Sequence, residues 1–430
     1  MTPTPDFRPV AVDLYAGAGG LSFGMEQAGF DVLTAAEFDP IHALTHRYNM
    51  PATPVLCSDL SENAVDTTSK MILSLVEDAW RTSGRQGKVQ IDAVVGGPPC
   101  QGFSVGGVRD SADDRNDQLL RFVDLVVSLK PKVFCLENVA GLLESRFSPI
   151  RDEAIRRLTV EGGYSLAGLD TAVNASDYGV PQSRRRVLIL GTSLDDVPEI
   201  SDFRSAAPLV GDALEGLPDL ARYRRLLRSD EVILRDADYA ALVSVESKYA
   251  RQIVGVETDP LDKSYPRAYS AHSLTGSLRT VHTKKTVQRF SRTPQGKAEP
   301  ISRLFRLDPA GFARTLRAGT GTDRGSHTSP RPIHPYKNRV VTVREAARLH
   351  GYPDWFRFHT TNWHGHRQVG NSVPPPLGAA AGRALISALG ITLIDRPNEV
   401  LELGRPEWLR MSGVEAAKVI GIADLARSFD

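Results

Sequence analysis

The chain is poor in cysteine and has no long hydrophobic run. Its 430 residues include only Cys57, Cys100 and Cys135, and no Cys-x-x-Cys spacing occurs. An odd number of cysteines in this arrangement argues against a disulfide framework or a thiolate zinc site, so we expect reduced thiols. No stretch of about 18 apolar residues is present, and the first residues lack the basic and apolar segments of a secretory signal. These absences predict a cytoplasmic protein without a membrane partner.

An excess of charge of one sign is also missing. The 52 lysines and arginines nearly balance the 51 acidic residues, which leaves a net charge of +1. Overall charge therefore does not indicate a nucleic-acid partner, and any basic surface must be local. The chain is longer than the size at which one hydrophobic core keeps growing. We expect one large domain and a smaller one.

The first half of the chain alternates short β-branched runs with amphipathic stretches. The runs are PVAVDLY, DVLTAAE, TPVLCSD, IDAVVGG and KVFCLEN. Apolar residues recur at helical spacing over residues 71–80 and 119–129, before the fourth and fifth runs. This order is typical of an α/β fold, in which crossover helices cover a mostly parallel sheet.

The regular pattern stops after one more strand-like run, VLILGTS, and we place a domain boundary near residue 196. It returns at Thr342, where TVRE predicts a capping box that opens a helix, with Gly351 and Pro353 placed to end it. A last apolar helix is expected over residues 377–389. Residues 391–430 carry no motif that we can interpret.

A glycine-rich segment, Asp13 to Gly20, follows the first strand and precedes a helix, so a ligand can approach its backbone closely. Ser22 stands where a dinucleotide fingerprint requires glycine, which disfavours a nicotinamide dehydrogenase. Glu37 and Asp59 end the second and third strands. Either acid alone could equally be a helix cap. Three such features at successive strand ends favour an adenosine-binding site.

Cys100 lies in the segment Gly96-Gly-Pro-Pro-Cys-Gln-Gly-Phe-Ser104, where prolines fix the backbone and glycines allow another molecule to approach the thiol. A reactive thiolate needs nearby positive charge, which Arg184 and Arg186 could supply. Glu137 ends the fifth strand and should share a crevice with Cys100, and Asn138 could cap a helix at the same time. The other two cysteines lie in apolar runs and are expected to be buried.

Six motifs in this order resemble those of the DNA (cytosine-5) methyltransferase family: DLYAGAGG, GGPPCQGFS, ENV, QSRRR, TVREAARLHGYPD and GNSVPPP. The resemblance covers residues 10–196 and about 336–385. It implies a Rossmann-like catalytic domain that binds S-adenosylmethionine and a smaller, irregular target-recognition domain. Tyr15 stands where the family usually has phenylalanine and retains the aromatic face.

The implied domains are a catalytic domain over residues 1–195, a target-recognition domain over 196–335, a return to the catalytic domain over 336–390 and a tail of unknown role over 391–430. The resemblance implies that Tyr15 packs on the cofactor, that Glu37 and Asp59 bind its ribose and adenine, and that the GNSV segment completes the site. The cofactor-binding residues that we assign on these motifs are Tyr15, Ala16, Gly17, Gly19, Gly20, Glu37, Phe38, Asp59, Leu60, Gly97, Pro99, Asn371, Ser372 and Val373.

The chemistry of cytosine assigns the catalytic roles. Carbon 5 is a poor nucleophile, so we expect the Cys100 thiolate to attack C6 while Glu137 holds or donates a proton at N3. Arg186 would steady O2 and the developing negative charge. The base must leave the helix, and Ser104 would belong to a loop that closes over it.

Cations are concentrated between residues 263 and 297, a segment without any acidic residue. Such a segment can be a solvated surface, but its place in the irregular insert favours contacts with duplex DNA. The expected DNA-binding residues are Lys263, Arg267, Arg279, Lys284, Lys285, Arg289, Arg292 and Lys297.

Two other functions fit parts of this pattern. An RNA (tRNA) cytosine-5 methyltransferase would use the same scaffold and chemistry, and a catalytically silent DNA-binding regulator could retain the fold. The silent regulator would have no reason to keep Cys100, Glu137 and Arg186 together. No metal site is expected, because no carboxylate or thiolate accompanies the histidines at 359, 364 and 366. The resemblance suggests a monomer, with or without a cognate restriction endonuclease in the cell.

Overall fold

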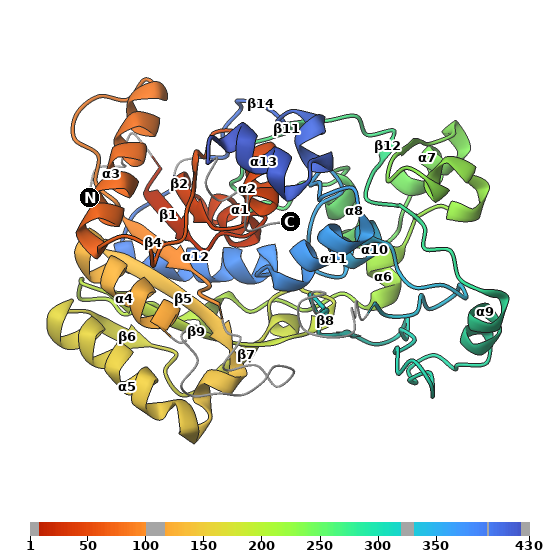
Figure 1. The fold of residues 1–430 in the computed structure, drawn as a ribbon, viewed down its shortest axis with the longest axis horizontal. Coiled ribbons are helices and arrows are strands. Elements are labelled where there is room, and N and C mark those ends of the chain that lie inside the picture. Colours follow the sequence, from red (N-terminus) through yellow and green to blue (C-terminus); the bar gives the residue numbers. More distant parts are fainter. Residues whose placement is uncertain (1–7, 100–116, 320–330, 394, 423–430) are drawn as a thin grey trace.

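The computed structural model describes residues 8–99, 117–319, 331–393 and 395–422. Its central feature is an eight-stranded sheet in the order β3-β2-β1-β4-β5-β9-β6, with β7 also paired to β9 (Figure 1). The strands are β1 (Val10–Leu14), β2 (Asp31–Glu37), β3 (Val55–Cys57), β4 (Ala93–Gly96), β5 (Val133–Val139), β6 (Ser165–Ala167), β7 (Ala172–Asn174) and β9 (Arg185–Thr192). The first five are parallel and coincide with the five predicted runs, whereas β6, β7 and β9 complete the sheet in antiparallel pairs. The predicted α/β fold with a mostly parallel sheet is confirmed.

Helices cover both faces of this sheet, as a parallel sheet requires. One apolar core joins the sheet to α3 (Val65–Thr82) and α4 (Asp117–Leu129). A second core joins the other face to α1 (Gly20–Ala28) and α12 (Pro375–Leu389). The remaining helices of this part are α2 (Pro40–Asn49) and α5 (Ser148–Arg156).

The helices predicted in the last third of the chain are present. The capping box is formed by Thr342 and Glu345 and opens α10 (Val343–Arg348), and Gly351 follows with a φ of 88°. Helix α12 ends at Leu389 as expected but begins two residues earlier than predicted, because prolines fit the first turn of a helix. Helix α12 packs tightly on α1, where a Cβ on Gly24 would collide with the backbone of α12. Helix α12 therefore fixes the position of α1, the helix that follows the glycine-rich loop.

The insert is irregular, as predicted, and its helices lie to one side of the sheet (Figure 1). Its helices are α6 (Val210–Leu214), α7 (Asp236–Val243), α8 (Lys248–Val254) and α9 (Lys284–Ser291). Its two-residue strands are β10 (Val232–Ile233), β11 (Arg267–Ala268), β12 (Ser273–Leu274) and β13 (Ala313–Arg314). Strand β13 pairs with β8 (Gln182–Ser183), and helix α11 (Asn362–Asn371) lies between α10 and α12 in the chain.

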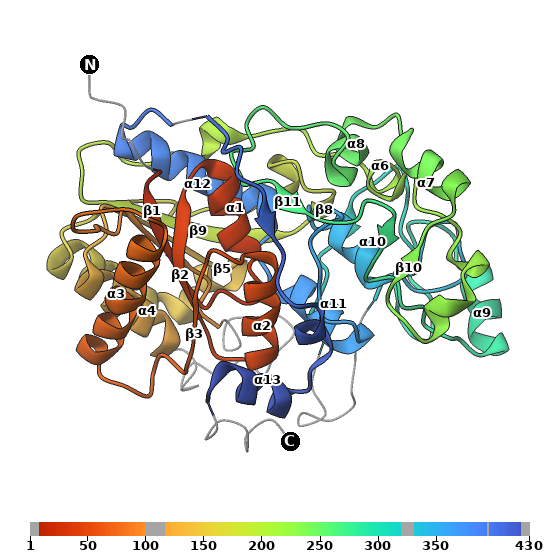
Figure 2. The same ribbon diagram turned by 90° about the horizontal axis from the view of Figure 1, so that it is seen from above.

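Residues 395–422 form a structured strap, although no motif in this part of the sequence indicates one. Strand β14 (Leu401–Glu402) pairs with β11, and α13 (Gly413–Ile420) packs on α2 (Figure 2). Ala416 of α13 contributes to a small core with Ile41 and Leu44 of α2. Among the described helices, none has the length and apolar character needed to cross a membrane.

Candidate active site

The glycine-rich loop leaves β1 with an unusual backbone. Tyr15, Gly17 and Gly19 have φ angles of 61°, 58° and 99°, and the left-handed conformation is rare for an aromatic residue. The Tyr15 hydroxyl donates to the side-chain oxygen of Gln118 at 2.8 Å. A Cβ on Gly17 would meet no atom within 4 Å, so the described residues leave one side of the loop open. Strain held by surrounding structure at an open loop is a common property of ligand sites.

Glu37 connects this loop to the end of β2. Its carboxylate accepts hydrogen bonds from the backbone amides of Gly17 and Asp39, both at 2.8 Å. Burial raises the pKa of Glu37, an effect that nearby His42 opposes. The N-cap of α2 is Asp39, so the helix-cap alternative does not apply to Glu37.

Asp59 lies just after β3. The two apolar residues assigned to the cofactor site, Phe38 and Leu60, directly follow Glu37 and Asp59 in the sequence. The Asp59 carboxylate accepts from the amide and hydroxyl of Ser61 at 2.8 and 2.6 Å, which forms a local turn. It does not cap α3, whose N-cap is Ala64. Phe38 leaves 42% of its surface exposed, whereas Leu60 is buried. An exposed aromatic beside an acid at a strand end suits an adenosine ligand.

The GNSV segment reaches this loop from the far end of the chain. A Cβ on Gly20 would collide with the carbonyl oxygen of Val373, so these residues are in close contact, and Ser372 lies beside them. Ala16 is also buried here, whereas Asn371 is exposed at the end of α11. The residues assigned from both ends of the chain therefore meet around the loop.

Arg184 holds the GNSV segment in place. Its buried guanidinium donates to the carbonyl oxygens of Leu316, Gly370 and Ser372, at 3.2, 3.0 and 3.0 Å. These bonds give Arg184 a positioning role for residues 370–372. Its expected place beside the Cys100 thiol stays a prediction, because Cys100 lies outside the described residues.

Gln182 and His350, which the sequence analysis missed, support the same segment. The Gln182 amide donates to the Leu349 carbonyl at 3.1 Å and contacts Nδ1 of His350 at 2.9 Å. His350 Nε2 contacts the Ser372 carbonyl at 3.0 Å. Both residues belong to motifs that carry the family resemblance, Gln182 to QSRRR and His350 to TVREAARLHGYPD, so these motifs could have indicated them.

Glu137 and Arg186 form an ion pair at the edge of the sheet, with Nε and Oε1 2.7 Å apart. Strand β9 runs antiparallel to β5 and pairs Arg186 with Val139, which places both charged side chains on one face. A Cβ on Gly97 would lie 3.0 Å from Glu137 Oε2. Gly97 and Arg186 therefore both lie beside Glu137, whereas the expected crevice with Cys100 involves a residue outside the described ranges.

The segment that leads to Cys100 is tied to β5. The Asn138 amide donates to the Pro98 carbonyl at 3.5 Å, and its oxygen accepts from the Val139 amide at 2.9 Å. The short helix after β5 has no side-chain cap, so Asn138 does not act as one. Pro99 is exposed, and Cys100 and Ser104 lie outside the described residues.

Cys57 and Cys135 are buried, as predicted, and Cys135 belongs to the apolar core on the α1 and α12 side of the sheet. Burial raises the pKa of Cys57 to about 12 and also raises that of Cys135. Neither thiol is suited to form a nucleophilic thiolate near neutral pH.

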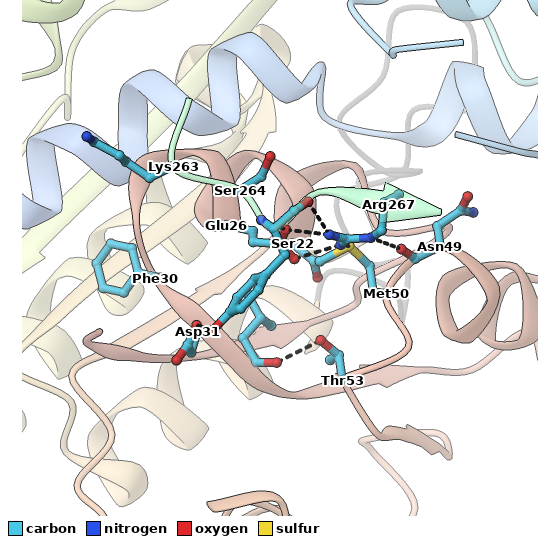
Figure 3. A network of polar contacts seen from close by, with 12 residues as sticks. Ser22, Glu26, Phe30, Asp31, Asn49, Met50, Thr53, Lys263, Ser264 and Arg267 are labelled. Carbon is cyan, nitrogen blue, oxygen red and sulfur yellow. Dashed lines mark hydrogen bonds and ion pairs between the residues drawn. The ribbon is translucent and has the colours of Figure 1, made fainter. Parts of the chain in front are cut away.

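The eight cations assigned to DNA binding separate into two groups. Arg267 is buried and holds Glu26 of α1 with two bonds of 2.9 and 2.8 Å, and it also donates to the Asn49 carbonyl at 3.1 Å (Figure 3). The Lys263 backbone is hydrogen-bonded to Gln27 and Arg8 in the same region. Arg267 therefore belongs to a buried ion pair with Glu26, which contradicts its prediction as a DNA-binding residue.

Of the other six cations, Lys284, Lys285 and Arg289 belong to α9, which lies at the outer end of the insert (Figure 1). Arg292 and Lys297 follow α9 in the chain, and the Arg279 amide donates to the Leu226 carbonyl. Lys284, Lys285, Arg292 and Lys297 are exposed, and Arg279 and Arg289 are half-buried. Four of these six cations are therefore exposed, and their contact with DNA stays a prediction.

The fold and the loop around Gly17 define the class of S-adenosylmethionine-dependent methyltransferases. A model of the family described as C-5 cytosine-specific DNA methylase matches residues 10–387. The chain therefore belongs to this family and is a DNA (cytosine-5) methyltransferase.

Several relatives resemble the chain over most of its length. The Type II methyltransferase M.XorII of Xanthomonas oryzae is 43% identical over 97% of this chain and 93% of its own. M.AgeI of Thalassovita gelatinovora is 29% identical over 88% and 99% of the two chains. A solved structure of a DNA modification methyltransferase encoded within an E. coli prophage covers 89% of this chain and 99% of its own, with 32% identity and a TM-score of 0.68.

Proposed function

We propose that the enzyme transfers a methyl group from S-adenosylmethionine to carbon 5 of a flipped cytosine in a specific duplex DNA sequence, through a covalent bond between Cys100 and C6. The observation that carries this proposal is the Glu137–Arg186 pair, beside the segment that leads to Cys100. The open side of Gly17, with Glu37 and Phe38 next to it, fits the adenosyl part of the cofactor.

In this mechanism the Cys100 thiolate forms a bond to C6, and the electron pair of the C5–C6 double bond becomes available at C5. Glu137 in its protonated form holds or donates its proton at N3, and the Arg186 guanidinium stabilises the charge at O2. When bound, S-adenosylmethionine supplies an electrophilic methyl group. Loss of the C5 proton then restores the double bond and expels the thiolate from C6. The target base reaches these residues only after it leaves the stacked duplex.

We further propose that the protein works in the cytoplasm as a Type II modification enzyme, as the names of its relatives suggest, either with a cognate restriction endonuclease or alone. Duplex DNA is the proposed partner and the enzyme acts as a monomer. Recognition of the target sequence would reside in residues 196–335, where the exposed cations around α9 lie.

The test of this function is covalent trapping. Duplex DNA that contains 5-fluorocytosine at the target should form a stable adduct with the enzyme in the presence of S-adenosylmethionine, because fluorine cannot leave as a proton does. Cys100→Ala should form no adduct on a denaturing gel. Cys57→Ala is the control and should still be trapped. An adduct with Cys100→Ala would assign the nucleophile elsewhere.

Glu37→Ala should weaken S-adenosylmethionine binding by about 10- to 100-fold, because hydrogen bonds to a charged group contribute roughly 1.5–3 kcal/mol each. The Gly17 amide would also lose its acceptor. Calorimetric titration measures the dissociation constant, with Glu77→Ala on the exposed side of α3 as the control. Equal affinities for the two variants would rule out Glu37 as a cofactor ligand.

A further inference from the structure

A buried polar chain lies beneath the glycine-rich loop and consists of Asp13, Ser22 and His46. Asp13 belongs to β1, Ser22 to the first turn of α1 and His46 to α2, and all three are fully buried. The Ser22 hydroxyl donates to Asp13 Oδ2 at 2.6 Å and contacts His46 Nε2 at 2.9 Å. The chain thus connects the elements on either side of the loop.

These distances fix the positions of the protons. Ser22 has one hydroxyl proton, and when Asp13 is ionised that proton goes to the carboxylate. The Ser22 oxygen must then accept a proton from Nε2 of His46, because a neutral imidazole carries hydrogen on only one nitrogen. Burial lowers the pKa of His46 to about 3, so its ring is neutral near pH 7. The charge of Asp13 therefore selects the tautomer of His46.

Asp13 has no cationic partner among the residues that the structure describes. Its second oxygen, Oδ1, is buried without a hydrogen-bond partner there. Burial raises the pKa of Asp13 to about 7, and the hydrogen bonds from Ser22 oppose this shift. The titratable groups facing Asp13 are His46 on α2, Glu37 at the end of β2, Cys135 on β5 and Tyr352 after α10. All of these are neutral or acidic, so a cation near the loop would stabilise the ionised carboxylate.

The loop rests directly on this chain. A Cβ on Gly19 would lie 3.0 Å from the His46 ring, and a Cβ on Gly20 would collide with the Tyr352 hydroxyl. The glycines allow the loop backbone to approach the buried groups. A change in the charge or orientation of these groups should therefore shift the backbone of the loop.

We infer that Asp13, Ser22 and His46 position the glycine-rich loop, and that the Asp13 carboxylate makes the site favour cationic S-adenosylmethionine over its uncharged product. The inference rests on the proposed cofactor site. S-adenosylmethionine carries a sulfonium in addition to its amino-acid group, whereas S-adenosylhomocysteine has a neutral thioether. A buried negative charge attracts the sulfonium strongly because the surrounding dielectric constant is low. Loss of this attraction after methyl transfer favours release of the product.

The test is calorimetric titration of the full chain with each of the two compounds between about pH 6 and pH 8, a range that spans the pKa of Asp13. A site that binds its ligand better when ionised gains affinity as pH rises and levels off above the pKa of the free protein. We expect the preference for S-adenosylmethionine to increase with pH, by at most about tenfold per unit. Asp13→Asn should abolish this dependence. Ser22→Ala should move the rise to higher pH, because it removes the hydrogen bond that stabilises the carboxylate.

Ser69→Ala is the matched control, since it also removes a buried serine hydrogen bond, to Ser128 at 2.8 Å, but away from the loop. It should behave as the unmodified protein does. A preference that is independent of pH in the unmodified protein, or unchanged in Asp13→Asn, would overturn the inference. If Asp13→Asn does not fold, the inference would be overturned by a Ser22→Ala protein whose preference for S-adenosylmethionine has the same pH dependence as that of the unmodified protein. Failure of the unmodified protein to bind either compound at any pH would instead contradict the proposed cofactor site.

Discussion

Glu137→Gln should lower kcat by about 10²- to 10⁴-fold, the usual contribution of a positioned acid or base, while cofactor affinity stays nearly unchanged. Glutamine has the shape of glutamate but lacks the negative charge that pairs with Arg186 at 2.7 Å. It therefore cannot hold a proton at N3 of the base in the same way. Single-turnover assays on duplex DNA measure the loss, and calorimetry measures the cofactor affinity.

The control for this variant is Glu144→Gln, in the same segment of the chain. Glu144 also pairs with an arginine, Arg146, but both side chains are more than a third exposed. Because exposed ion pairs contribute little, this change should affect neither kcat nor stability appreciably. A Glu137→Gln enzyme with nearly normal kcat would remove Glu137 from the mechanism, whatever the result for Cys100.

The sequence was sufficient to predict the strands and loops that position the site, because these elements follow local patterns of apolar, polar and glycine residues. The five β-branched runs became the parallel strands β1 to β5, and the motif acids lie at strand ends since strands and loops alternate regularly. Glu137 and Arg186 were each given a role at the same base, but the ion pair between them was not predicted. Their ion pair depends only on which strands are neighbours, and β9 pairs with β5.

Hydrogen-bond and ion-pair partners of single side chains could not be predicted where no motif indicated them. Arg184 was assigned a role from its charge, but its carbonyl partners Gly370 and Ser372 lie 186 and 188 residues away. The strap after residue 390 has short elements and no motif, and its contacts with α2 and β11 are non-local. The sequence does not distinguish an arginine in a buried ion pair from one on a solvated surface. For this reason Arg267 was wrongly predicted to bind DNA.

Arg267→Ala should destabilise the protein by about 3–5 kcal/mol, because it leaves the buried Glu26 carboxylate without its cation. The Arg267 side chain is 0% exposed and that of Glu26 is 6% exposed. The guanidinium also lies 5.1 Å from the centre of the Trp355 ring, so the change removes packing as well as charge. Denaturant unfolding measures the loss. The double variant Glu26→Gln, Arg267→Met should recover part of it, because no buried charge then remains unpaired.

Lys285→Ala is the contrasting control, since it removes an exposed cation from the same predicted group. Its free energy of unfolding should stay within about 0.5 kcal/mol of the unmodified value, as is usual for surface substitutions. If α9 faces the DNA backbone, its binding to duplex DNA should weaken for all sequences alike, and the slope of log K against log salt should fall by about one. Arg267→Ala should leave this slope unchanged under conditions where the variant is folded. A reduced slope for Arg267→Ala together with normal stability would return that arginine to the DNA surface and contradict the buried ion pair.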